Sequence, residues 1–173
     1  MLRHQRALAA PTAAMRAAMG WADWPARMQP LGPGPLRDLL PAGADLWLDG
    51  GHNPAAARAV ADHLRAVVPA GRPLHLVMGL LANKDAPGVL RAFAGRHATL
   101  HAVPVPDHAF HPPAELAAMA KGVGLTAQPA KDVPDALGWI GRHADRAAPP
   151  FVLVLGSLYL AGEVLRQNGQ APE

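Results

Sequence analysis

A three-layer α/β domain with a mostly parallel sheet is the fold that this sequence predicts, preceded by a helix and a Pro/Gly-rich linker. From residue 45 to residue 167, short apolar segments alternate with longer segments of helical periodicity, and such alternation builds parallel sheets. The segment FVLVL at 151–155 has no polar alternation, which is typical of a strand covered on both faces. With 173 residues, the chain is long enough for one domain with a substantial core.

The hydrophobic pattern places the individual elements along the chain. Strands are expected at 45–49, 73–78, 98–103, 125–128 and 151–155. Helices are expected at 54–68, 85–94, 113–122, 134–147 and 157–167. In the first of these helices, Ala56, Val60, Leu64 and Val67 form one apolar stripe, so this face is expected to pack on the sheet.

The N-terminal part of the chain has a different character. Residues 2–19 have the pattern of an amphipathic helix. The segment that follows, GWADWPARMQPLGPGPLRDLLP at 20–41, is rich in proline, glycine and tryptophan. This composition predicts a linker or a short irregular hairpin rather than a part of the core.

Composition excludes several classes of function. The chain has no cysteine, so disulfides and thiolate zinc sites are excluded, and a reducing, cytoplasmic location is expected. The net charge is +3, and no basic stripe with interleaved aromatic residues predicts nucleic-acid binding. No apolar run reaches the roughly 20 residues that a membrane span requires.

The end of the first parallel strand carries the richest set of polar groups, in the sequence LDGGHNP at 48–54. Ligands bind at the carboxyl ends of strands in open parallel sheets, and Asp49 sits at such an end. Its carboxylate suits ribose hydroxyls or the water shell of a cation better than a phosphate. His52 can donate or accept a proton near neutral pH, and Asn53 can cap the helix that follows. The alternative is that Asp49 and His52 only tie this turn together.

Two further strand ends carry candidate residues. Lys84 could meet a phosphate or a substrate carboxylate, although an ordinary solvated lysine is the alternative. Ser157 is a natural N-cap that could also offer its hydroxyl to an anionic ligand, and no partner pattern marks it as a nucleophile. Tyr159, the only tyrosine, is expected to pack with its hydroxyl satisfied.

The histidines do not form a recognisable metal motif. His101, His108 and His111 lie near Asp107, but their spacing in a proline-rich stretch matches no strong zinc pattern, so this stretch is interpreted as a possible substrate-side loop. The remaining histidines are expected on the surface or on helix faces: His4, His63, His75, His97 and His143. The sequence also lacks a phosphate-binding loop of the GxxxxGK[ST] type and a GxGxxG fingerprint, which disfavours an autonomous ATPase or an NAD enzyme.

Four motifs in order resemble a known family. The segments WPAR at 24–27, LDGGHNP at 48–54, MGLLANKD at 78–85 and LVLGSLYLAGEVL at 153–165 are similar to those of the folylpolyglutamate and dihydrofolate synthases, which belong to the Mur ligase superfamily. The resemblance covers about 150 residues and is specific through the combination of HNP with GSLYLAGEV. It implies a Rossmann-like C-terminal domain at 27–173, preceded at 1–26 by the tail of an ATPase domain and the linker.

The resemblance also implies a function. The family phosphorylates a pteroate or folate carboxylate with ATP, and the amine of L-glutamate then attacks the acyl phosphate. The C-terminal domain is a lid on an N-terminal ATPase domain, which carries the phosphate loop and most ligands of Mg²⁺. The fragment is therefore expected to be inactive alone and to hold neither ATP nor Mg²⁺ by itself. The alternative function is a non-catalytic Rossmann-like module that binds a small ligand or a protein.

Site residues follow from the matching motifs. Arg27 and Asp49 match residues that contact ATP in the family, whereas cleft or glutamate-binding roles are implied for His52, Asn53, Lys84 and Ser157. Two departures affect the linker. Ala26 stands where glycine is usual, and the segment GPGPLRDLLPAG at 32–43 looks like an insertion that bears on the reach of Arg27.

Overall fold

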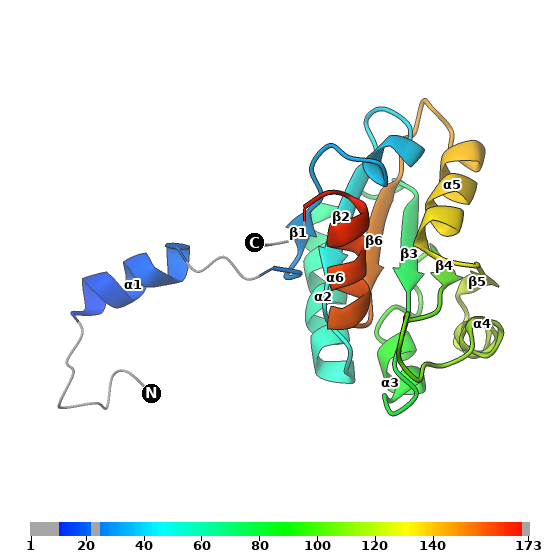
Figure 1. Ribbon diagram of the computed structural model, residues 1–173, viewed down its shortest axis with the longest axis horizontal. Coiled ribbons are helices and arrows are strands. Elements are labelled where there is room, and N and C mark those ends of the chain that lie inside the picture. The colour runs from blue at the N-terminus through cyan, green and yellow to red at the C-terminus, as the bar shows by residue number, and fades with distance from the viewer. Residues whose placement is uncertain (1–10, 22–24, 171–173) are drawn as a thin grey trace.

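Six strands form a single sheet in the order β1-β2-β6-β3-β4-β5 (Figure 1). The computed structural model describes residues 11–21 and 25–170. β1 pairs antiparallel with β2, and all other neighbours are parallel. The strands are β1 (Gln29–Pro30), β2 (Asp45–Asp49), β3 (Leu74–Met78), β4 (Ala98–Ala102), β5 (Thr126–Pro129) and β6 (Phe151–Leu155).

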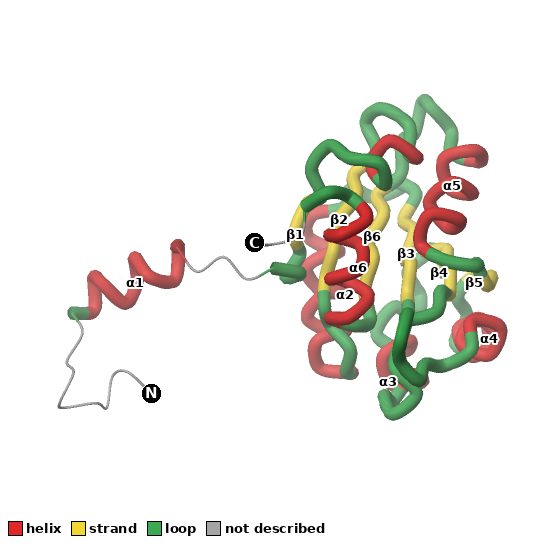
Figure 2. The backbone as a smooth tube through the Cα atoms, viewed as in Figure 1, coloured by secondary structure: helices red, strands yellow, loops and turns green. Residues whose placement is uncertain are grey.

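Helices cover both faces of the sheet and complete three layers (Figure 2). One face packs against α2 (Pro54–Val67), α3 (Ala86–Arg91) and α4 (Pro113–Gly122). The other face packs against α5 (Val133–His143), α6 (Leu158–Gln167) and the two leucines, Leu36 and Leu40, that flank the 3-10 helix η2 (Arg37–Leu39). Every residue of β6 is buried, as expected for a central strand between two helical layers. The predicted three-layer α/β fold is thus confirmed.

The strands at the centre of the sheet end level with one another. Asp49 of β2 and Met78 of β3 both lie opposite Leu155 of β6. Because these strands are parallel, the loops that follow them leave from the same edge. This register places three loops side by side.

Most predicted element boundaries agree with the structure to within one or two residues, and two differ more. α5 ends at His143 rather than at 147, because Ala144 is extended, with φ −69° and ψ 136°. α3 spans only six residues, Ala86–Arg91, and turns follow it. No helix in the described part of the chain is long and apolar enough to cross a membrane.

The N-terminal helix and linker differ in part from the prediction. α1 (Thr12–Trp21) covers the later part of the helix expected at 2–19, whose residues 2–10 lie outside the described range. The prediction that the linker stays out of the core was wrong: Leu31, Leu36 and Leu40 are buried in the core beneath α5 and α6. Proline and glycine suggested a loop but gave no sign that its leucines pack inward.

A buried asparagine attaches this linker to the end of the chain. Asn168 Oδ1 accepts hydrogen bonds from the N–H groups of Leu36 (3.0 Å) and Arg37 (3.3 Å). Its Nδ2 donates to the carbonyl oxygen of Gly32 at 3.1 Å, and Asn168 is only 2% exposed. The amide therefore satisfies a turn whose backbone groups would otherwise lack partners.

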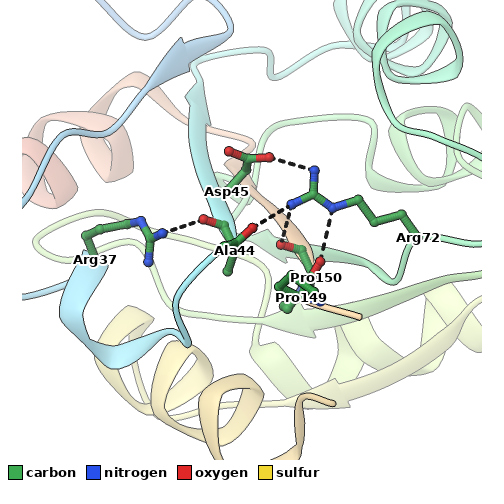
Figure 3. Close-up of polar contacts among 7 residues, drawn as sticks. Arg37, Ala44, Asp45, Arg72, Pro149 and Pro150 are labelled. Carbon is green, nitrogen blue, oxygen red and sulfur yellow. Dashed lines mark hydrogen bonds and ion pairs between the residues drawn. The ribbon is translucent and has the colours of Figure 1, made fainter. Parts of the chain in front are cut away.

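Arg72 clamps the amino-terminal edge of the sheet (Figure 3). Its guanidinium donates to Asp45 Oδ2 at 2.6 Å and to the carbonyl oxygens of Pro149 (3.0 Å) and Pro150 (3.3 Å). It also lies 5.7 Å from the centroid of the Phe151 ring. One side chain thereby joins the starts of β2 and β6.

The prediction that His75 lies on the surface or on a helix face was wrong: His75 is half-buried on β3 and pairs with a second histidine. His75 on β3 lies 3.1 Å from His101 on β4, measured between Nδ1 and Nε2. Gln128 Nε2 donates to His101 Nδ1 at 3.1 Å, so the proton of the neutral His101 ring sits on Nε2 and points at His75. Burial lowers the pKa of His75 to about 4. Burial and the neighbouring His75 likewise lower the pKa of His101 to about 4, opposed by Asp135.

Replacing Arg72 by lysine is predicted to destabilise the domain almost as much as replacing it by methionine. The ammonium group of lysine cannot reproduce a planar fork that serves several oxygens at once. The expected loss is about 1–3 kcal/mol in the free energy of unfolding, measured by urea denaturation. Arg58→Met on an exposed face of α2 is the control. A fully stable Arg72→Lys variant would contradict the clamp.

The histidine pair is predicted to make the domain acid-sensitive. Both pKa values are lower in the folded state than the ordinary 6.5, so the unfolded chain binds more protons between pH 6.5 and 4. The free energy of unfolding therefore has its full value above pH 6.5, where these histidines are neutral in both states, and it decreases as the pH falls toward 4. Between pH 7 and 5, urea unfolding should show a loss of about 1–2 kcal/mol per histidine. His75→Gln should reduce this loss, and the exposed His97→Gln should not.

Candidate functional site

The crossover pattern opens a crevice at the carboxyl edge of the sheet. The loops after β2 and β3 lead to α2 and α3 on one face, whereas the loop after β6 leads to α6 on the other. β6 lies between β2 and β3, so its loop departs in the opposite direction from both neighbours. Ligands bind in doubly wound sheets where such loops part. Two cavities lie at this place.

Asp49 stands at the first cavity and joins three backbone segments. Its Oδ1 accepts from the N–H of Gly51 at 2.7 Å, and its Oδ2 accepts from the N–H of Met28 at 2.9 Å. The residue is 4% exposed yet lines the cavity. The tying role considered for Asp49 is therefore present in the structure. Each carboxylate oxygen has a second lone pair that these two hydrogen bonds do not use.

Arg27 reaches the same cavity despite the long segment that separates it from Asp49. The carbonyl oxygen of Ala26 accepts from the N–H of Gly50 at 2.8 Å, which holds the linker against the end of β2. Arg27 is exposed, and its Nη1 donates to the same Ala26 oxygen at 3.1 Å. A side chain at Gly50 would collide with Leu158 and approach Arg27 Nη1 to 2.9 Å. The segment at 32–43 folds onto the core and does not displace Arg27.

The backbone at Ala26 adopts a conformation that favours glycine, the residue that the resemblance leads us to expect at this position. Ala26 has φ +58°, in the left-handed region that favours glycine, and Met28 has φ +42°. The N–H of Ala26 donates to Gln29 Oε1 at 2.9 Å, which helps to hold this turn. Alanine is tolerated at this position at a cost in backbone energy.

The start of α2 forms a wall of this first cavity, which has a volume of about 430 Å³. Asn53 is the predicted N-cap and accepts from the N–H of Ala56 at 2.9 Å. His52 Nδ1 lies 2.9 Å from the carbonyl oxygen of Gly50, so it donates there and leaves Nε2 available. His63 of α2 also lines the cavity; it is exposed on the helix, as predicted, but the sequence did not indicate that it belongs to this cavity. Its spacing of seven residues from Ala56, two helical turns along α2, was the signal that could have revealed it, because Ala56 also lines the cavity.

The second cavity lies over the end of β6 and has a volume of about 340 Å³. It is lined by His52, Leu81, Lys84, Gly156, Ser157, Leu158 and Tyr159. Ser157 caps α6, since its Oγ accepts from the N–H of Tyr159 at 3.1 Å. Gly156 has φ +112°, and a Cβ there would lie 2.5 Å from the carbonyl oxygen of Gly79. Glycine is thus required where the ends of β6 and β3 approach.

Tyr159 is not the packing residue that the sequence predicts. It is 56% exposed, and its ring stacks on His108 with a centroid distance of 3.7 Å and an interplanar angle of 28°. His101 lies on β4 and is fully buried, away from this loop. His111 Nε2 instead lies 3.0 Å from the carbonyl oxygen of Lys84. The loop after β4 therefore contacts Lys84 and Tyr159, two residues that line the second cavity. Its interpretation as a substrate-side loop stays a prediction.

All six predicted site residues lie at one edge of the sheet. The first cavity collects Arg27, Asp49, His52 and Asn53, and the second collects His52, Lys84 and Ser157. His52 belongs to both. Among the described residues, no group of three or more His, Cys, Asp or Glu side chains could hold a metal ion. The cationic groups Arg27 and Lys84 make the two cavities suitable for anionic ligands.

Comparison with known proteins agrees with the fold. The family model described as "Mur ligase, glutamate ligase domain" matches residues 36–158. A comparison with curated protein sequences found no match. The structure resembles a bifunctional folylpolyglutamate synthase/dihydrofolate synthase from Yersinia pestis, with 26% identity and a TM-score of 0.70 over 92% of this chain and 34% of that one.

Two further solved structures are similar. For the folylpolyglutamate synthase from Thermotoga maritima, the identity is 25% and the TM-score 0.67, over 94% of this chain and 35% of that one. For the Mycobacterium tuberculosis folylpolyglutamate synthase complexed with ADP and AMPPCP, the identity is 23% and the TM-score 0.75, over 95% and 36%. The last likeness concerns the fold alone. The chain thus spans about a third of the length of these structures.

A doubly wound α/β domain with an anion-compatible crevice at its carboxyl edge is the class that fold and site define. The family model covers most of the chain, including β2, β6 and the loops after them. The chain belongs to the Mur ligase, glutamate ligase domain family.

Replacing Asp49 by asparagine is predicted to loosen the linker at this site. Asparagine has one acceptor oxygen, so its NH₂ group would face the N–H of either Met28 or Gly51. We expect faster hydrogen exchange at the Met28 and Gly51 amides and a loss of about 1–3 kcal/mol in the free energy of unfolding. Asp45→Asn, at the other end of β2, should leave both amides protected. Unchanged exchange at Met28 in the Asp49→Asn variant would contradict this account.

Proposed function

We propose that this chain acts as the C-terminal lid domain of an ATP-dependent ligase that joins L-glutamate to dihydropteroate or folates through an acyl phosphate. The observation that carries the proposal is the convergence of Arg27, Asp49, His52, Lys84 and Ser157 on one crevice in a member of the Mur ligase family. The solved structures it resembles are about three times as long and include complexes with ADP and AMPPCP.

Arg27 and Asp49 are the proposed contacts to ATP. Arg27 presents an exposed guanidinium that suits phosphate oxygens, and Asp49 offers the lone pairs that backbone N–H groups leave free. Their proximity is fixed by the bonds of Asp49 to Met28 and of Ala26 to Gly50. ATP with Mg²⁺ would supply the phosphoryl group that activates the acceptor carboxylate.

The second cavity is the proposed place for the incoming amino acid. Lys84 supplies a cation for a carboxylate, and the Ser157 hydroxyl, which accepts from Tyr159 N–H, can donate its own proton to a ligand. His52 borders both cavities, so it lies between the proposed nucleotide and amino-acid places. This arrangement would bring the amine of L-glutamate near the activated carboxylate.

The proposal includes a partner domain and a hinge. Residues 1–26 are the proposed tail of an N-terminal ATPase domain and the linker, and 27–173 form the lid. An acyl phosphate reacts with water, so a lid that closes over the crevice would protect it. The domain is proposed to be inactive alone and to retain neither ATP nor Mg²⁺ by itself. The proposed location is the cytoplasm.

The purified chain alone is predicted to show no glutamate-dependent formation of ADP. Substituted for the C-terminal third of the Thermotoga maritima enzyme, it should restore this turnover with dihydropteroate or a reduced folate. In that chimera, Arg27→Ala should lower kcat/KM for ATP about 10- to 100-fold, since charged hydrogen bonds of this kind are lost.

Arg58→Ala is the matched control, because Arg58 is also exposed but lies on α2 outside both cavities. Equal loss in both variants would remove Arg27 from the nucleotide site. A chimera that folds but never turns over would count against the ligase proposal and favour a non-catalytic module, and turnover by the isolated chain would refute its inactivity.

A further inference from the structure

Tyr159 lines the second cavity, but its ring does not pack in either buried cluster of the domain. Tyr159 is 56% exposed. Its backbone N–H is fixed by Ser157 Oγ, but that bond does not set the side-chain rotamer. The aromatic partner of its ring is His108, at 3.7 Å between centroids. The direction of the ring therefore depends on a residue from another loop.

His108 is itself held firmly. Its Nδ1 donates to the carbonyl oxygen of Pro106 at 2.8 Å, which orients the ring. The loop that carries it is bonded to the loop after β3: the N–H of Ala82 donates to Ala109 O, and the N–H of His111 donates to Leu80 O, both at 2.9 Å. The loop after β3 also carries Lys84. The backbone bonds therefore join the loop after β4 to the loop of Lys84, and the stack joins it to the start of α6.

His108 does not line the cavity, whereas Tyr159 does. We propose that His108 is a positioning residue for the amino-acid site, which holds the Tyr159 ring as a preformed wall without touching the ligand. This inference rests on the proposed function, which assigns the second cavity to an amino acid. An exposed tyrosine samples several rotamers, and a stack that selects one of them removes the entropy cost of ordering it upon binding. The ring face can then pack on the methylene groups of a glutamate-like side chain while Lys84 meets its carboxylate.

The sole tyrosine of the chain makes the test specific, because ¹³C-labelled tyrosine gives the ring signals of Tyr159 alone. The chain is titrated with L-glutamate and followed through these signals and the Ser157 amide. In the His108→Ala variant, the ring signals should move toward those of free tyrosine, and the dissociation constant for L-glutamate should rise about three- to tenfold. His108→Phe, which keeps a flat stacking ring, should restore most of the affinity.

His143 provides a matched control. It stacks on Trp139 at 4.1 Å with an interplanar angle of 18°, and its Nδ1 donates to Trp139 O at 2.8 Å. This stack lies on α5, outside both cavities. His143→Ala should change neither the tyrosine signals nor the affinity for L-glutamate.

Three results would overturn the proposal. If His108→Ala leaves the tyrosine signals unchanged, the stack does not hold the Tyr159 ring. If the signals shift but the dissociation constant for L-glutamate stays the same, a fixed Tyr159 ring is not needed for binding. If the unaltered chain fails to respond to L-glutamate at any soluble concentration, the cavity is not an amino-acid site. That last result would leave the ligase proposal to be decided by turnover of the chimera, so the two failures are distinguishable.

Discussion

The carboxylate of Asp49 is the interaction on which the arrangement of the site depends. It ends β2, turns the chain through the Gly51 N–H, and captures the linker through the Met28 N–H. Together with the backbone bond between Ala26 and Gly50, the Met28 bond holds the backbone of Arg27 beside Asp49. Asp49, for which the sequence predicts a role in ligand binding, has a structural role in the domain, because its carboxylate accepts two backbone hydrogen bonds.

The level ends of β2, β6 and β3 then divide the crevice into two cavities. Helices on opposite faces draw the flanking loops apart, and α6 begins in the gap with Ser157 as its cap. His52 stands at the boundary and borders both sides. Such a division suits a reaction with two ligands that must meet, because each can be bound by its own set of residues.

The opposite edge of the sheet has a different physical character. There Arg72 joins the starts of β2 and β6, and Asn168 attaches the linker to the end of α6. Both satisfy backbone groups that helices and strands leave without partners. Closed bonding at one edge and open cavities at the other are what a domain needs if it is to move as a rigid body over a ligand.

Periodicity by itself determined the elements and the layers, because FVLVL is buried as predicted, and so is the apolar side of α2 at Val60 and Leu64. The predicted stripe on α2 was wrong at its two ends: Ala56 is half-buried and lines the first cavity, and Val67 is 42% exposed. The motif LDGGHNP likewise indicated that its polar residues lie at the carboxyl edge of the sheet, where they line the first cavity, since parallel strands present their ends at one edge. Only the tertiary structure decided which residues far apart in the sequence come into contact. The burial of the linker leucines, the pairing of His75 with His101 and the stack of Tyr159 on His108 all depend on partners 20 or more residues away, which local pattern does not encode.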